Sequence, residues 1–287
     1  GVVFNEMKGA YSSPDGVLYR ASQQAVFPDN AYVWDSGGDP AVIPQLTYEQ
    51  FKAFHTTYYH PSNALIYFYG DDDPQERLRL FDAYLSAFDA QPVSAQIGEQ
   101  PRFPSPRRIT RPYGTEAGGD QTPKAFVQVN WLLPAADDPA LVMGLSMLSY
   151  SLVSTQASPL RKTLIDSGLG EDLTGGGLSV VLREMTFSVG MKGVTPGRDM
   201  EVEELILSTL AKLAQDGIDR EMIEAAYNTF EFSLRENNTG STPRGLSTMF
   251  QALRNWVYGR DPLTPLAFEA PLAAVREQID NNPTYFQ

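Results

Sequence analysis

Glu6 is the residue near the start of the chain whose type and position most favour chemistry. The apolar residues around it recur at helical spacing: Val3, Met7, Ala10 and Tyr11. Spacing of this kind predicts a half-buried helix. Because Glu6 lies at the edge of the apolar stripe, its carboxylate can point into a cleft while the helix is anchored to a core. The other interpretation is a solvated glutamate at the border of an amphipathic helix, which composition alone favours.

The remaining residues that suggest metal chemistry are two histidines and a run of aspartates. His55 and His60 lie on either side of a predicted helix end. Zinc sites on one helix use spacings of roughly three or four residues, so we interpret both histidines as packing or surface residues. The run Asp71-Asp72-Asp73 lacks the alternating ligands and the later glutamate of an EF-hand loop, and we interpret it as a helix cap.

Two glycine-rich runs are candidates for binding loops. In Asp35-Ser36-Gly37-Gly38-Asp39-Pro40, the glycines supply backbone freedom and the proline requires an extended approach. A ligand loop is compatible with this run, but we favour a structural loop because loop glycines usually serve geometry. The run Gly175-Gly176-Gly177 is not a phosphate loop, since it lacks the spaced Gly-Lys-Ser/Thr and the following helix.

The composition excludes several classes of protein. The chain has 287 residues, a net charge of −13 and no cysteine. Disulfides and thiolate chemistry are therefore excluded. Nucleic-acid binding is not expected, because it needs clustered Lys and Arg, whereas an acidic body attracts basic peptides. No apolar run approaches the roughly 18 residues that cross a bilayer, so no membrane span and no membrane partner are predicted.

The elements that position these residues begin with a helical region, residues 1–90. Thr47 is the predicted N-cap of a helix over residues 48–58, and Asp73-Pro74 starts a second helix. Between them, residues 64–69 predict a buried strand. The spacing of Phe51, Phe54 and Tyr58 predicts the apolar face of the first helix. The second helix is expected to have a buried face made of Leu78, Phe81, Leu85 and Phe88.

Residues 91–122 are predicted to be a linker. Prolines and glycines recur there and no apolar period is present. The stretch is also the most basic part of the chain, and we expect its arginines to clamp two domains together: Arg102, Arg107, Arg108 and Arg111.

Residues 123–287 are predicted to form a second domain. Alternating apolar residues predict strands over residues 124–133 and 185–191. Asp138-Pro139 and Ser158-Pro159 are predicted helix starts, and three amphipathic helices follow near Val202, Asp219 and Pro243. The fold class expected from this alternation is α+β, in two units joined by the linker.

Several of these runs resemble one protein family. Residues 1–9, with Glu6, resemble the helix that carries the distal glutamate zinc ligand in inverted-zincin metallopeptidases of the pitrilysin/insulinase type. The whole chain is similar to the presequence protease branch of that family. Runs that carry the resemblance include Ser36-Gly37-Gly38-Asp39-Pro40, Ala157-Ser158-Pro159-Leu160-Arg161-Lys162, Phe187-Ser188-Val189-Gly190-Met191-Lys192-Gly193-Val194 and Glu231-Phe232-Ser233-Leu234-Arg235-Glu236-Asn237-Asn238-Thr239-Gly240.

The resemblance implies a fold of four related α+β domains in two halves, which close around a chamber for short, unfolded peptides. Residues 1–90 would be the later part of the zinc-binding first domain, and residues 123–287 most of the second domain without its last strand. Residues 282–287 resemble the helix before that strand. The chain is thus expected to be a piece of a longer enzyme, cut at both ends.

The resemblance also implies the chemistry of that parent. Zinc would be held by Glu6 and by two histidines of an upstream H-x-x-E-H helix, whose glutamate activates water. Since this chain lacks that helix, it is expected to bind no catalytic zinc and to hydrolyse nothing, and no residue in it is assigned as catalytic. The parent is expected to degrade short basic peptides such as cleaved presequences, in the mitochondrial matrix or chloroplast stroma; a bacterial cytoplasm is the alternative.

Two other functions stay open. Related folds serve as non-catalytic core proteins of respiratory complexes and as the inactive partner of processing peptidases, so a structural subunit is the alternative to a peptidase. An independent peptide-binding module is less favoured, because the first domain lacks its opening strands.

Overall fold

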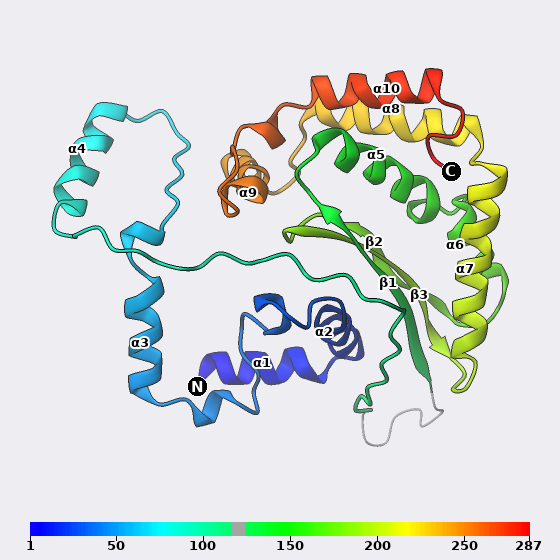
Figure 1. Ribbon diagram of the computed structural model, residues 1–287, viewed down its shortest axis with the longest axis horizontal. Coiled ribbons are helices and arrows are strands. Elements are labelled where there is room, and N and C mark those ends of the chain that lie inside the picture. Colours follow the sequence, from blue (N-terminus) through cyan, green and yellow to red (C-terminus); the bar gives the residue numbers. More distant parts are fainter. Residues whose placement is uncertain (116–123) are drawn as a thin grey trace.

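The computed structural model describes residues 1–115 and 124–287. The chain combines helices with one small antiparallel sheet (Figure 1), so the mixed α and β character expected from the sequence is confirmed. The division into two domains stays a prediction. The end of the predicted linker, residues 116–122, and the predicted start of the second domain at residue 123 lie outside the described residues.

Three strands form the sheet: β1 (Ala125–Ala135), β2 (Asp172–Ser179) and β3 (Glu184–Val194). Their order is β1-β3-β2, and both pairings are antiparallel. The triple glycine lies inside β2, where the register shifts between Thr174 and Gly177. Gly175 has φ +85°, and a Cβ there would lie 2.8 Å from the Ser188 backbone. Glycine is required at this bulge because the other residue types would clash and be strained.

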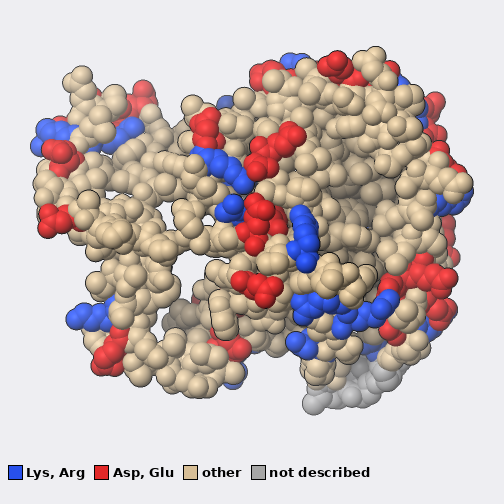
Figure 2. All heavy atoms as spheres, viewed as in Figure 1, with Lys and Arg blue, Asp and Glu red and all other residues tan. Residues whose placement is uncertain are grey.

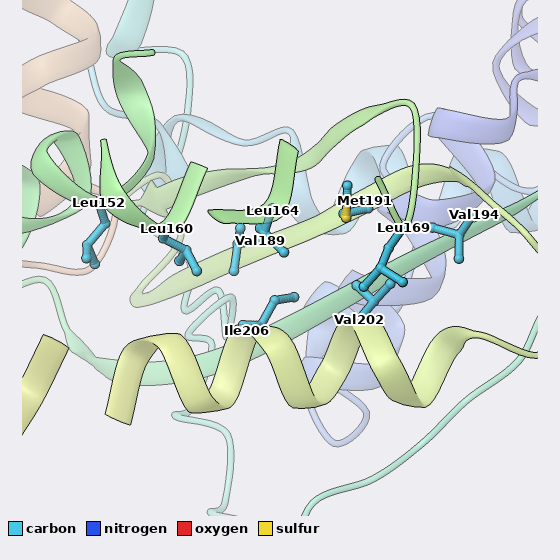
Figure 3. Close-up of a cluster of buried hydrophobic side chains, with 9 residues drawn as sticks. All are labelled: Leu152, Leu160, Leu164, Leu169, Val189, Met191, Val194, Val202 and Ile206. Carbon is cyan, nitrogen blue, oxygen red and sulfur yellow. The ribbon is translucent and has the colours of Figure 1, made fainter. Parts of the chain in front are cut away.

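One face of the sheet carries the main hydrophobic core (Figure 3). The alternating side chains Val127, Val129 and Trp131 of β1 pack against it, as the strand pattern predicts. Helices α6 (Pro159–Asp166) and α7 (Asp199–Asp216) cover this face. The buried residues of the cluster are Leu152, Leu160, Leu164, Leu169, Val189, Met191, Val194, Val202 and Ile206.

A second core joins three helices: α5 (Pro139–Ser149), α8 (Arg220–Glu236) and α10 (Glu269–Asn281). Its buried residues are Met147, Tyr227, Leu272, Val275 and Ile279. The helix α9 (Arg244–Trp256) follows Pro243, as expected.

Helix α10 was not predicted, although its buried residues recur at helical spacing. The helix expected over residues 282–287 is wrong, because α10 ends at Asn281 and a turn follows. Asn282 accounts for the ending: its side chain accepts a hydrogen bond from the Thr284 amide, a local bond that competes with a further helical turn.

The stretch Pro139–Asp166 has 28 residues and contains an 18-residue window with a mean hydropathy of 1.2, so its length and composition are those of a membrane span. The sequence expectation of no such stretch therefore needs correction on those two criteria. In the structure a short π-helix, Tyr150–Ser154, and a turn separate α5 from α6. Met147 packs in the second core, and Leu160 and Leu164 pack in the first. These contacts bury part of the stretch, and 28% of its apolar window is buried in the structure.

Helices dominate the first part of the chain: α1 (Val2–Ser12), α2 (Pro14–Val26), α3 (Tyr48–Tyr58) and α4 (Pro74–Leu85). The predicted starts of α3 and α4 are confirmed. Thr47 and Gln50 form a capping box, and Asp73 caps α4. The buried face expected of α4 is wrong, because α4 contains no buried residue, and α3 contains none either. Figure 2 shows α3 and α4 as an arm with open gaps beside it.

The strand predicted over residues 64–69 is also wrong, since the described backbone there has no strand pairing. Its side chains are exposed, with Leu65 at 43% and Tyr69 at 61% of their full exposure. A strand needs a neighbour for its N–H and C=O groups, and the described residues provide none here. Instead, this segment, α3 and α4 line an open hollow of about 680 Å³ that includes Phe54, Tyr58 and Tyr84.

Candidate functional site

Glu6 lies in the second turn of α1 and is exposed. In the described residues its carboxylate makes no hydrogen bond and no ion pair. The helix predicted around it is confirmed, but it is less buried than expected: α1 has no buried residue, and Val3 is 56% exposed. Only part of the predicted stripe, including Met7 and Tyr11, is half-buried. Glu6 is thus a free carboxylate beside a lightly packed helix face.

Arg20 of α2 makes two contacts with the end of α1 and a third with the loop at Asp35. Its guanidinium carbon lies 3.4 Å from the centroid of the Tyr11 ring. Its Nη2 donates a hydrogen bond of 3.0 Å to the carbonyl oxygen of Ala10. Its Nη1 lies 3.8 Å from Oδ2 of Asp35, and both side chains are largely buried, at 13% and 19% exposed. A cation here also satisfies a carbonyl at the helix end and complements the helix dipole.

The loop around Asp35 is built by its own hydrogen bonds. The Gly37 amide donates 3.0 Å to Oδ1 of Asp35, and the Gly38 amide donates 2.9 Å to the Asp35 carbonyl. Gly38 has φ +88°, a conformation that favours glycine. Asp39 closes the loop by accepting a 2.7 Å hydrogen bond from the Ala41 amide. These internal hydrogen bonds define the shape of the loop.

Gly37 brings this loop against α1. A Cβ on Gly37 would lie 2.3 Å from Sδ and 2.9 Å from Cε of Met7. Burial raises the pKa of Tyr11, and the charges of Asp35 and Asp39 raise it further, with Arg20 opposing them. Tyr11 therefore contacts the same loop as Met7. Residues 35–39 and Arg20 form one cluster with Met7, Ala10 and Tyr11 of α1, and Glu6 directly precedes Met7 in that helix.

The histidines are not part of this cluster. The His55 ring stacks on Tyr59 at 4.9 Å, and His60 Nδ1 accepts a 3.2 Å hydrogen bond from the Ser62 amide. Within residues 1–115 and 124–287 no group of three or more His, Cys, Asp or Glu side chains is placed to hold a metal ion. Their contacts agree with the interpretation of both histidines as structural. The aspartate run behaves as a cap, with Asp73 on α4 and Asp72 paired with Arg77.

A second polar cluster lies where the first part of the chain meets the sheet. Ser22 Oγ of α2 accepts hydrogen bonds of 3.1 Å from Gln128 and 3.4 Å from Asn130, on the face of β1 opposite the main core. The Tyr32 and Tyr258 hydroxyls lie 2.7 Å apart. Burial, together with the hydrogen bond to Tyr32, raises the pKa of Tyr258.

The segment after residue 90 is also tied to this junction. Gln100 donates from its amide to the buried Glu184 carboxylate at 2.8 Å, and its side chain donates to Asp29 at 2.6 Å. Sequence reasoning missed these contacts, since the residues involved lie 71 and 84 positions apart. No local pattern marks such pairs.

Two of the four predicted clamp arginines contact the sheet or its helices. Arg102 donates to the carbonyl oxygens of Leu132 and Leu133 at 2.5 and 3.0 Å. Arg108 pairs with Glu203 of α7. The other two make local contacts, Arg107 over the Phe103 ring and Arg111 with Thr110. Arg102 and Arg108 therefore attach the basic segment to residues 124–287, whereas the described contacts of the four arginines include none with residues 1–90.

Comparison with known proteins gives these clusters a family context. A family model described as "Peptidase M16 inactive domain" matches residues 45–230. Presequence protease 1, chloroplastic/mitochondrial, from Arabidopsis thaliana is 51% identical over 282 residues, which is 97% of this chain and 26% of that protein. Protein HypA from Clostridium perfringens is 38% identical over 100% of this chain and 29% of its own length. The chain thus spans about a quarter of the length of the curated relatives it matches.

Solved structures agree on the fold. The crystal structure of the peptidase M16 inactive domain from Pseudomonas fluorescens matches 99% of this chain and 64% of that one, with a TM-score of 0.67 and 16% identity. At this identity the match concerns the fold alone.

Proposed function

The chain belongs to the M16 peptidase family, and from that premise we propose that it is one segment of a zinc metalloendopeptidase that degrades short, unstructured peptides. The observation that carries the proposal is the 51% identity to a presequence protease over 97% of this chain. Cleaved organelle-targeting presequences are the proposed substrates. In domain terms, residues 1–90 belong to the zinc-binding unit and residues 123–287 to a second unit, joined by the linker 91–122.

Glu6 is the proposed contribution of this chain to the metal site. Its donor chemistry fits, because catalytic zinc takes carboxylate oxygen beside histidine nitrogens. Its carboxylate is exposed on α1 and makes no ion pair within residues 1–115 and 124–287, so it is free to accept such a role. Zinc in such a site would polarise a peptide carbonyl and activate water. What this chain supplies is one negative ligand on α1; the two histidines and the general base come from the parent's H-x-x-E-H helix.

Charge supports the substrate class. The chain carries a net charge of −13, and organelle presequences are rich in arginine and poor in acids. Opposite charge raises the local concentration of such peptides near the protein. The proposed partners are therefore short basic peptides and the remaining parts of the parent enzyme, with no nucleic acid and no membrane among them. The proposed compartment is the mitochondrial matrix or chloroplast stroma, after the relatives' names, with a bacterial cytoplasm as the alternative.

A non-catalytic structural subunit is the second candidate. The description "inactive domain" of the family model over residues 45–230 favours it for that part of the chain. Glu6 lies outside those residues, so the match leaves its role open. The sequence of the parent ahead of residue 1 separates the two candidates: a complete H-x-x-E-H motif supports the peptidase, and its loss supports the subunit.

The direct test of Glu6 is Glu6→Gln in the full-length parent. We expect zinc affinity and peptide cleavage to fall together by more than about 100-fold, because a lost ligand costs more than the roughly 10–100-fold of an outer-shell partner. The matched control is Glu49→Gln, an exposed glutamate in the first turn of α3; it should change neither quantity. Unchanged zinc affinity in Glu6→Gln contradicts the assignment.

The substrate class and the role of the isolated chain need separate measurements. The parent should cleave an arginine-rich peptide faster than an acidic peptide of equal length, and should leave a folded protein intact. Equal cleavage of all three substrates contradicts both the size and the charge preference.

The chain alone should hold no stoichiometric zinc after dialysis and show no hydrolysis, because a single carboxylate lacks the ligand set that gives zinc sites their affinity.

A further inference from the structure

Helix α1 is held in place without a hydrophobic core. None of its residues is buried, so packing of the usual kind does not fix the direction in which Glu6 points. Helix α1 packs mainly on α2. Two of its contacts are specific: Arg20 of α2 binds its C-terminal end, and Gly37 of the loop lies against Met7. We therefore expect the direction of α1 to depend on each of these contacts.

The contacts of Arg20 resist rotation of the helix end. The ring of Tyr11, the carbonyl of Ala10 and the carboxylate of Asp35 meet the same guanidinium from three directions. Because the Arg20–Asp35 pair is largely withdrawn from water, salt screens it less than an exposed pair. Arginine suits this place because its planar, delocalised group both stacks on a ring and donates in a fixed fork.

The contact of Gly37 sets how closely the loop approaches α1. Met7 directly follows Glu6, and its sulfur occupies the space where a Cβ of residue 37 would be. Gly37 does not have a positive φ, so its backbone conformation is open to alanine. Glycine is needed at this position because the Met7 side chain leaves no room for a Cβ, and not because of the backbone conformation. An added methyl group would push Met7, and Glu6 with it, away from the loop.

We propose that residues 35–39, with Arg20, are a positioning device that sets the direction of the Glu6 carboxylate towards the zinc site. The proposal rests on the proposed function, in which Glu6 is a zinc ligand. Arg20, Asp35 and Gly37 are then positioning residues that never touch the metal. Outer-shell groups that orient ligands affect metal affinity by about 10–100-fold when changed, which gives the size of the effect to look for.

The test uses Gly37→Ala in the full-length parent. We expect its zinc affinity, measured by competition with a chelator, to fall about 10-fold, with kcat falling more than KM changes. The matched control is Gly9→Ala on α1 itself, where a Cβ meets nothing within 4 Å; its zinc affinity should equal that of the wild type. Met7→Ala added to Gly37→Ala removes the sulfur and should restore most of the affinity, a rescue that general destabilisation would not show.

A second variant keeps the proposal falsifiable if Gly37→Ala does not fold. Arg20→Lys keeps the charge but loses the fork and the planar stack, and should also weaken zinc binding. Wild-type zinc affinity in both Gly37→Ala and Arg20→Lys overturns the proposal, as does an equal loss in Gly9→Ala. Glu6→Gln separates the positioning proposal from the proposed function. If Glu6→Gln weakens zinc binding and the loop variants do not, only the positioning role of the loop is contradicted. If Glu6→Gln leaves zinc binding unchanged, the assignment of Glu6 as a zinc ligand is contradicted as well.

Discussion

Residues 124–287 and residues 1–90 are built from the same kinds of amphipathic helix, but only the helices of residues 124–287 enclose clusters of buried hydrophobic side chains in the described residues. In residues 124–287, α6 and α7 close one face of the sheet, and α5, α8 and α10 close a second core. In residues 1–90, Val26 and Phe27 are the buried hydrophobic residues, and both lie at the end of α2, the helix that contacts β1. Burial in the first region therefore occurs next to the sheet of the second.

The comparison teaches that an apolar helix face becomes a core only when another surface lies opposite. Helix α3 has a capping box and a clear apolar stripe, yet Phe51 is 66% and Phe54 is 59% exposed. Helix formation needs only local signals such as caps and spacing. Burial needs a partner element, and the described residues offer none to α3. The hydrophobic contribution to stability, roughly 25 cal/mol per Å² buried, therefore falls mostly in residues 124–287.

The largest expected difference between the regions is in the cost of truncating a side chain. Leu164→Ala removes a side chain with 0% exposure from the main core and should lower the free energy of unfolding by about 2–5 kcal/mol. Phe51→Ala in α3 removes a larger side chain that is 66% exposed, and should change it by less than about 0.5 kcal/mol. Urea unfolding of the chain followed by circular dichroism measures both. Equal costs for the two variants would contradict the comparison.

Local features of the fold could be read from the sequence, and long-range ones could not. The caps Thr47, Asp138 and Asp219 were predicted and are observed, because a cap is a contact between near neighbours. The alternation in β1 and β3 also predicted which face is buried. The strand over residues 64–69 failed, because a strand depends on a neighbour that a local pattern does not supply.

The candidate site shows the same limit. Glu6 was singled out by the resemblance of residues 1–9 to a zinc-ligand helix, but the contacts that hold its helix were missed. Arg20 and Asp35 lie on separate elements, and Gly37 was assigned only to a loop. Sequence spacing gives no sign that Gly37 receives Met7. Glycines beside a candidate ligand helix are the one signal that points to such close approaches.

An intermediate loss of unfolding free energy is expected where residues 1–90 contact residues 124–287, at the Tyr32–Tyr258 hydroxyl pair. Tyr32→Phe removes a hydroxyl that lies 2.7 Å from that of Tyr258 and accepts a 3.2 Å hydrogen bond from the Arg183 amide. Leaving these partly buried partners unsatisfied should cost about 1–3 kcal/mol. The control, Tyr48→Phe, alters a side chain that is 70% exposed and should cost nothing measurable. No loss in Tyr32→Phe, measured by thermal or urea unfolding, would mean that the regions are not coupled here.

The smallest expected effect concerns the ion pairs that close the second core from outside. Arg276 of α10 donates to the Glu224 carboxylate of α8 at 2.6 Å. This hydrogen bond lowers the pKa of Glu224 below its ordinary value of 4.5; partial burial opposes the shift, and Arg220 adds to it. A carboxyl group whose pKa is lower in the folded state stabilises the fold above its unfolded-state pKa, and that stability is lost as pH falls through the folded-state pKa. The pair is partly exposed, so its contribution should stay below about 1 kcal/mol.

Glu224→Gln tests the contribution of this ion pair between α8 and α10 to the free energy of unfolding. The variant should unfold more easily than the wild type near pH 7, and the difference should shrink as pH falls below about 4.5, because the wild-type carboxylate then takes up its proton. The control is Glu277→Gln on α10, whose exposed carboxylate makes no ion pair in the described residues; it should follow the wild-type curve. High salt should reduce the effect near pH 7, because both partners are partly in water. A difference that persists unchanged at pH 3 would show that Glu224 acts through packing and not through its charge. The second core would then be closed by shape alone, with the charged rim of α8 and α10 contributing as little as the exposed helix faces of residues 1–90.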